Sequence, residues 1–199
     1  MAVSAQDVKK LRETTGAGML DCKKALEEAN GDFEEAIATL RKKGISVAAK
    51  REGKTASEGT VASYIHAGDQ IGVLVEVNCE TDFVARTDDL KNFAKELCMQ
   101  VAAQQPRWVA PEDVPESALD KEREILKEMA LTEGKPEAIV DKMVEGRMRK
   151  FYETYCLLKQ AYIRDDSKTI EDLLNDVVAK TGEKIVIRRF TRYQVGAEG

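Results

Sequence analysis

The chain has 199 residues, of which 43% are hydrophobic and 34% are charged, so it can bury a core beneath a strongly solvated surface. Its formal net charge of −5 and pI near 5.2 argue against nucleic acid as the main ligand, because phosphate binding requires a concentrated basic surface. No apolar run approaches the ~20 residues needed to span a bilayer and no secretory signal opens the chain, so we expect a cytoplasmic protein that makes no membrane contact.

Residues 4 to 44 show the spacing of three short helices. Ser4 is a candidate N-cap for the first helix, Gly31 follows the second, and Asp32 is placed to cap the third. We expect the third helix to end before Gly44 and the three helices to form a minimal bundle.

Residues 46 to 58 are small, polar and basic without a sustained period, which is typical of a linker or a frayed helix. We place a domain boundary in this segment. The expected organisation is a bundle domain at residues 1 to 45 and a core domain at residues 59 to 199.

The core domain has the pattern of an α+β fold. Two runs rich in β-branched residues flank the turn-like tetrapeptide AGDQ, residues 67 to 70, and predict a β-hairpin. A third strand is predicted near residues 183 to 195, which gives a three-stranded antiparallel sheet covered by helices. Two charged helices at residues 116 to 152 are joined by a short connection and predict a projecting helical hairpin.

A large apolar residue, Phe83, lies in the segment NCETDFVARTDD, residues 78 to 89, between a predicted strand and a predicted helix. Such a connection runs over the surface because its backbone polar groups need water. The ring must therefore either turn back into the core or meet another molecule.

Side chains for catalysis or metal binding do not gather in any recognisable pattern. His66 is the only histidine, and the four cysteines lack the spacing of a zinc site, so we expect no metal, no cofactor and no enzymatic activity. Cys79 lies near Glu80 and Asp82, carboxylates that raise the pKa of a thiol and disfavour the reactive thiolate. No glycine-rich phosphate loop of a known type is present.

A protein without a catalytic constellation can work by binding. The N-terminal bundle resembles the ubiquitin-associated type, which presents the start of its second helix to partners. Met19 and Leu20 occupy that position, after the segment TTGAG, and we expect at least one of them to be exposed. The alternative is that both belong to the core. The segment TTGAGM, residues 14 to 19, could cup an anion at a helix N-terminus, but a plain interhelical turn explains it as well.

Three long segments in order resemble the elongation factor Ts family, the guanine-nucleotide exchange factors of the translational GTPase elongation factor Tu. They are LRETTGAGMLDCKKALEEANGDFEEAI, then GTVASYIHAGDQIGVLVEVNCETDFVAR, then GKPEAIVDKMVEGRMRKF. The resemblance runs nearly end to end and implies a bundle, a core of sheet and helices, and a helical hairpin, as the residue patterns do.

The resemblance also implies roles for individual residues. The segment Thr81, Asp82, Phe83 and Val84 is expected to enter the nucleotide domain of elongation factor Tu, with the Asp-Phe pair near the magnesium and phosphate site. Met19, Leu20 and Lys23 are expected to contact a surface helix of the same domain, and His66 to contact another domain.

The chain differs from the longer family members in having one hairpin-plus-helix unit where they have two. We therefore expect a homodimer, in which sheet edge and hairpin supply the second contact surface from the other subunit. Two competing hypotheses are a ubiquitin-associated-type adaptor without exchange activity and an enzyme that uses Cys79 with Glu80 or Asp82.

Overall fold

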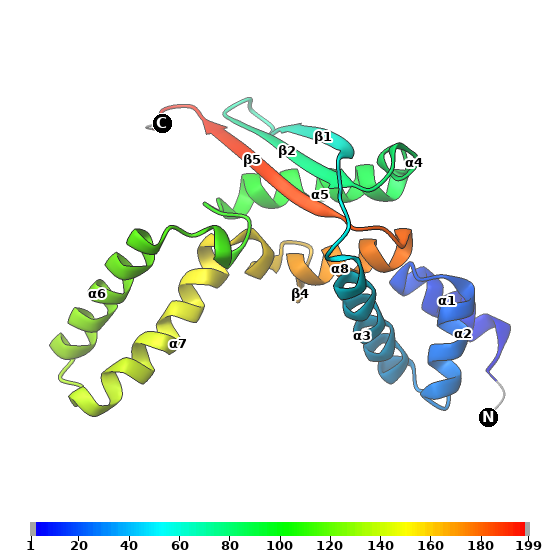
Figure 1. Ribbon diagram of the computed structural model, residues 1–199, viewed down its shortest axis with the longest axis horizontal. Helices are drawn as coiled ribbons and strands as arrows, with labels where there is room; N and C mark the ends of the chain where they lie inside the picture. Colours follow the sequence, from blue (N-terminus) through cyan, green and yellow to red (C-terminus); the bar gives the residue numbers. More distant parts are fainter. Residues whose placement is uncertain (1–2, 198–199) are drawn as a thin grey trace. The chain divides into compact units, whose positions relative to one another are not determined.

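The predicted α+β class is confirmed by a computed structural model, which describes residues 3–197 (Figure 1). Its elements are α1 (Ala5–Thr15), α2 (Met19–Glu28), α3 (Phe33–Arg51), β1 (Glu58–Ile65), β2 (Ile71–Cys79), α4 (Asp82–Ala85), α5 (Asp88–Gln104), α6 (Glu116–Thr132), α7 (Glu137–Tyr155), β3 (Ala161–Tyr162), β4 (Asp165–Thr169), α8 (Ile170–Thr181) and β5 (Val186–Gln194). Within residues 3–197, no helix is both long enough and apolar enough to cross a lipid bilayer.

The chain divides into two compact units. The first unit contains the chain up to Tyr64, Leu74–Cys98 and Glu171–Thr191. The second contains Ile65–Val73, Met99–Ile170 and the chain from Arg192 onward. Each is described by itself below.

The N-terminal bundle of the first unit begins with the predicted caps. The side chain of Ser4 accepts a hydrogen bond from the Asp7 amide at 3.1 Å, and Asp32 accepts one from the Glu35 amide at 2.9 Å. Each such cap is worth about 1 kcal/mol, because it satisfies a helix amide that has no partner within the helix. The bundle core is a cluster of seven buried residues: Val8, Leu11, Cys22, Ala25, Leu26, Ala29 and Ala36. A three-helix bundle is therefore present; its likeness to the ubiquitin-associated type remains a prediction.

Helix α3 does not end before Gly44, so this part of the prediction was wrong. It continues to Arg51 and takes up the first part of the predicted linker. Gly44 is buried, and a Cβ atom there would lie 3.2 Å from the backbone oxygen of Asn175 in α8. The glycine thus permits two helices to approach closely rather than stopping one of them. The division into a bundle domain and a core domain remains a prediction.

An ion pair between the half-exposed Arg41 and the buried Asp172 adds to this contact between α3 and α8. Asp172, which is 8% exposed, accepts a hydrogen bond from Arg41 Nε at 2.9 Å. A carboxylate removed from water must be compensated by donors, and the guanidinium provides two of them because Nη2 also lies within ion-pair distance.

The three-stranded antiparallel sheet has the order β1-β2-β5, and the β1–β2 hairpin turns at the predicted tetrapeptide. The His66 amide closes this turn by donating to the carbonyl of Ile71 at 2.9 Å. Every second residue of β2 points to its buried face: Val73, Val75 and Val77. Helix α5 covers that face with a buried stripe: Leu90, Phe93, Ala94, Leu97, Cys98 and Val101.

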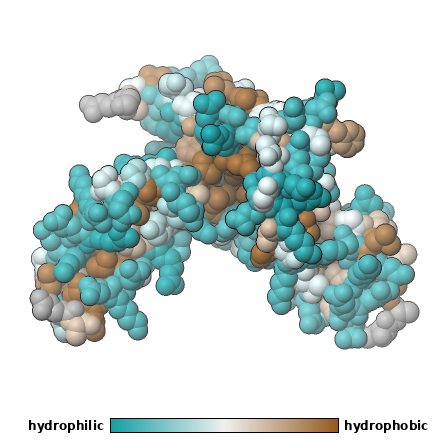
Figure 2. Space-filling view, viewed as in Figure 1, coloured by the Kyte–Doolittle hydropathy of each residue, from teal (hydrophilic) through white to brown (hydrophobic). Residues whose placement is uncertain are grey.

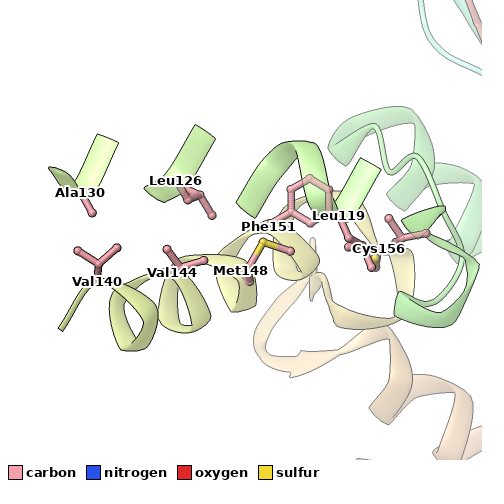
Figure 3. Packing of buried hydrophobic residues seen from close by; sticks show 9 residues of the cluster. Leu119, Leu126, Ala130, Val140, Val144, Met148, Phe151 and Cys156 are labelled. Carbon is pink, nitrogen blue, oxygen red and sulfur yellow. The ribbon is translucent and has the colours of Figure 1, made fainter. Parts of the chain in front are cut away.

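The helical hairpin of the second unit has its own core, shown in Figure 3. Ala130 of α6 faces Val140 of α7, and Leu126 faces Val144 one layer further along. Near the base, the ring of Phe151 lies 6.0 Å from that of Trp108 and 5.0 Å from that of Tyr155, measured between centroids. The predicted hairpin at residues 116 to 152 is therefore confirmed.

Two buried amides join α5 to the segment that follows the hairpin. Gln100 Nε2 donates to Gln160 Oε1 at 3.2 Å and to the carbonyl of Ala161 at 3.0 Å. Gln160 Nε2 donates to the carbonyl of Thr154 at 2.8 Å, so both side chains are compensated for the loss of water. The small β3–β4 ladder that follows was not predicted, because β3 has two residues and β4 is polar, which leaves no period to detect.

The contact at Gly44 can be tested against a second helical glycine, Gly146 of α7, where a Cβ atom would meet nothing within 4 Å. Alanine normally stabilises a helix interior by about 0.5–1 kcal/mol relative to glycine. We expect Gly146→Ala to give this gain in the free energy of unfolding, measured by urea denaturation. Gly44→Ala should give none, because the added methyl group crowds the Asn175 carbonyl. Equal gains at the two positions would contradict the packing role of Gly44.

Candidate functional site

Phe83 is exposed just after the end of β2, which decides between the two placements that the residue pattern left open. The connection after β2 contains a single helical turn, α4, and Phe83 is its second residue. Its side chain is 77% exposed, whereas the neighbouring Val84 is 5% exposed and anchors the turn in the core. Figure 2 shows a hydrophobic projection where α4 lies in Figure 1. An aromatic side chain left in water on a short, anchored turn is available to be buried by a partner.

Thr81 sets the start of this turn. Its hydroxyl accepts a hydrogen bond from the Val84 amide at 3.3 Å and donates one to Glu183 Oε1 at 2.7 Å. The first bond is the N-cap of α4, and the second joins the turn to the connection between α8 and β5. Thr87 continues this pattern, because its hydroxyl donates to the Val84 carbonyl at 2.7 Å.

Asp82 is exposed beside Phe83. Its carboxylate lies 3.0 Å from Arg86 Nη2, one helical turn along the chain. Both side chains are more than half exposed, so this ion pair contributes little to stability, roughly 0.3–0.5 kcal/mol. A carboxylate held so weakly is free to exchange its partner for another cation.

Met19, Leu20 and Lys23 lie on α2 of the bundle. Leu20 is 75% exposed and Met19 is 44% exposed, which confirms that at least one of the pair is exposed. Lys23 lies 3.7 Å from Glu27 in a solvent-exposed pair. This surface and the Phe83 turn belong to the same compact unit, whereas His66, exposed in the β1–β2 turn, belongs to the other.

The environment of the cysteines disfavours thiol chemistry. All four thiols are free and buried. Burial, and then the charge of Glu183, raise the pKa of the Cys79 thiol, while burial raises the pKa of both Cys98 and Cys156 to about 11. Among residues 3–197 there is also no group of three histidine, cysteine, aspartate or glutamate side chains that could hold a metal ion.

A family model described as Elongation factor TS matches residues 1–197. The chain belongs to the elongation factor Ts family. Proteins called elongation factor Ts from Thermoanaerobacter sp. (strain X514) and from Caldanaerobacter subterraneus subsp. tengcongensis are 64% and 61% identical over 194 residues, 98% of this chain and 95% and 97% of theirs. One from Syntrophus aciditrophicus is 57% identical over 198 residues, 100% of this chain and 98% of its own.

This member of the elongation factor Ts family is accordingly a translation elongation factor. The residues that the resemblance singled out, from Thr81 to Val84, fold into one turn. Glu183 was not among them, although it binds Thr81. Local sequence carries no signal for it, because the contact joins residues 102 positions apart.

The burial of the thiols predicts that this member of the elongation factor Ts family is unreactive toward Ellman's reagent at pH 8 while folded. A thiol with a pKa of about 11 is about one part in a thousand thiolate at that pH, and the reagent also needs access to the sulfur. We expect all four cysteines to react within minutes in 6 M guanidinium and none to react at that rate without it. Rapid reaction of one thiol in the native protein would contradict the prediction, and its loss in Cys79→Ser would support the hypothesis of a Cys79 enzyme.

Proposed function

We propose that this protein is the guanine-nucleotide exchange factor of elongation factor Tu, and that it acts by inserting the Asp82-Phe83 turn near the magnesium and phosphate site of the GTPase. The observation that carries the proposal is the exposure of Phe83, 77%, on a short turn that is anchored by the buried Val84 and by the Thr81 cap, which is bonded to Glu183. In a member of the elongation factor Ts family, this combination favours a side chain used for insertion.

Exchange of this kind needs no catalytic group on the factor. A factor that binds the nucleotide-free GTPase more tightly than the loaded form must, by linkage, weaken nucleotide binding by the same ratio. The protein therefore accelerates GDP release through differential affinity, and it is not a catalyst of bond making or breaking.

The energy available from Phe83 is sufficient for a large effect. Burying one aromatic ring contributes roughly 2–3 kcal/mol, which corresponds to a factor of about 30 to 150 in an equilibrium constant. Disturbing the magnesium ion adds to this effect, since the cation neutralises the phosphates that bind the nucleotide to the GTPase.

Met19, Leu20 and Lys23 supply a second contact in this proposal. Two exposed apolar side chains beside a lysine fit a partner surface that is apolar at its centre and acidic at its edge. His66 supplies a further contact with another domain of the GTPase. The same exposed pair would also suit a ubiquitin-associated-type adaptor, so the activity measurement must separate the two functions.

The test is the release of labelled GDP from elongation factor Tu in the presence of the native protein and of Phe83→Ala. We expect the variant to lower kcat/KM for release at least tenfold, because the ring is exposed before binding and buried afterward. Ile45→Ala is the matched control, since Ile45 is a 50% exposed apolar residue of α3 that the proposal leaves unused.

Equal release with the native protein and Phe83→Ala would assign exchange to other contacts. If neither protein accelerates release, the adaptor function is favoured and the proposal is wrong.

We also propose that the protein is a homodimer, in which the second copy supplies the contacts that longer family members carry in one chain. The support is apolar exposure on neighbouring strands: Val61 of β1 is 66% exposed and Leu74 of β2 is 46% exposed. β1 is also an edge strand of the three-stranded sheet. A paired surface of this kind removes both the apolar side chains and the strand edge from water.

Sedimentation velocity at micromolar concentration tests the dimer. We expect the native protein to sediment with twice the chain mass and Val61→Glu to sediment mostly as a monomer, because a carboxylate at the interface lacks a partner. Leu20→Glu is the control, with the same charge change at an exposed residue of the bundle. A native protein of monomer mass would refute the dimer.

A further inference from the structure

The carboxylate of Glu183 accepts three hydrogen bonds from the residues that follow β2. Glu183 Oε2 accepts from the amides of Glu80 and Thr81, both at 3.1 Å, and Oε1 accepts from the Thr81 hydroxyl at 2.7 Å. Hydrogen bonds to a charged acceptor are stronger than neutral ones. One side chain from the α8–β5 connection therefore holds both the backbone amide and the hydroxyl of Thr81.

Glu80 makes the reciprocal contact, because its carboxylate binds the segment that carries Glu183. Its Oε1 accepts from the amide of Lys184 at 2.6 Å, and its Oε2 accepts from Arg51 Nη1 at 3.4 Å. Each of the two glutamates thus binds backbone amide groups on the segment that carries the other. We name the four residues Glu80, Thr81, Glu183 and Lys184 the glutamate clasp.

The position of Glu183 follows from the end of α8. Gly182 has φ of +70°, a left-handed conformation that a residue with a side chain adopts only with strain. Its amide donates to the carbonyl of Val178 at 2.8 Å and closes the helix. The chain then reverses direction, which brings the next residue, Glu183, against the end of β2.

The clasp reaches Phe83 through a single residue. The Thr81 hydroxyl that donates to Glu183 also accepts from the Val84 amide, so the rotamer that Glu183 selects is the one that caps α4. Without the carboxylate, the hydroxyl can turn away from the cap, and a helix of four residues has little stability of its own.

We propose that Glu183 is a positioning residue for nucleotide exchange: through Thr81 it holds the turn that presents Phe83 to the GTPase. This inference rests on the proposed function. A turn that is ordered before binding loses less conformational entropy when the complex forms, so more of the contact energy is available to weaken nucleotide binding.

A double-mutant cycle in GDP release from elongation factor Tu tests the inference. The variants are Glu183→Ala, Phe83→Ala and the two combined. We expect Glu183→Ala alone to lower kcat/KM for release about tenfold, and to lower it less than twofold when Phe83 is already alanine. The two effects overlap because Glu183 acts only through the ring.

Two further variants separate positioning from general stability. Glu183→Gln retains a carbonyl acceptor for the amides of residues 80 and 81 and should keep release within threefold of the native rate. Thr81→Val removes the hydroxyl with little change of shape and should reproduce the loss seen for Glu183→Ala, even if that variant folds poorly. The midpoint of thermal unfolding is measured for each variant by circular dichroism.

The outcomes distinguish this inference from the proposed function. The positioning role would be overturned if Glu183→Ala released GDP at the native kcat/KM. It would also be overturned if Glu183→Ala lowered kcat/KM by the same factor in the native protein and in Phe83→Ala. In both cases the effect of Phe83→Ala alone would stand. The role would also be overturned if the decrease in kcat/KM across the variants simply tracked the decrease in their thermal unfolding midpoints. If Phe83→Ala accelerates GDP release from elongation factor Tu as much as the native protein does, the insertion mechanism and the positioning role are both wrong.

Discussion

The structure of the first unit depends on how two carboxylates are compensated at the end of β2. Each of Glu80 and Glu183 accepts hydrogen bonds from backbone amide groups on the segment that carries the other, and these bonds join the end of β2 to the connection after α8. The same helix, α8, contacts α3 at Gly44 and through the Arg41–Asp172 pair. Through α3 it is connected to the bundle that carries Leu20. Two of the surfaces proposed to meet the GTPase, the Phe83 turn and the start of α2, therefore belong to one compact unit.

This arrangement allows the Phe83 side chain to be exposed on a turn whose backbone is well ordered. An aromatic ring exposed to water contributes no burial energy to the turn that carries it. Such a turn therefore tends to collapse onto the protein or to become mobile. Here the order comes from residues on either side of the ring: the buried Val84 below it and the Thr81 cap before it. Phe83 can then remain exposed while the backbone that carries it is held by contacts in which the ring takes no part.

Much of the fold follows from short-range patterns. The caps at Ser4 and Asp32 and the β1–β2 turn each depend on residues within a few positions, and all three were predictable. The local pattern at Phe83 left a buried and an exposed ring open, and only the family resemblance favoured the exposed one. Gly44 was misinterpreted because a glycine indicates a helix end or a close helix contact equally well, and only the position of Asn175 decides between them. Glu183 could not be assigned to the site at all, since its partner is 102 positions away and glutamate on a loop is ordinarily a solvated charge.

The helical hairpin has a consequence for how proteins of this kind can vary. Two layers of its core each take one residue from α6 and one from α7, and the aromatic cluster around Phe151 closes the core at the base. Removing or adding about two turns, roughly seven residues, from both helices changes the number of layers and leaves the remaining ones intact. Insertions and deletions of this size can therefore accumulate during evolution at the far end of the hairpin, independently of selection on the unit that carries Phe83.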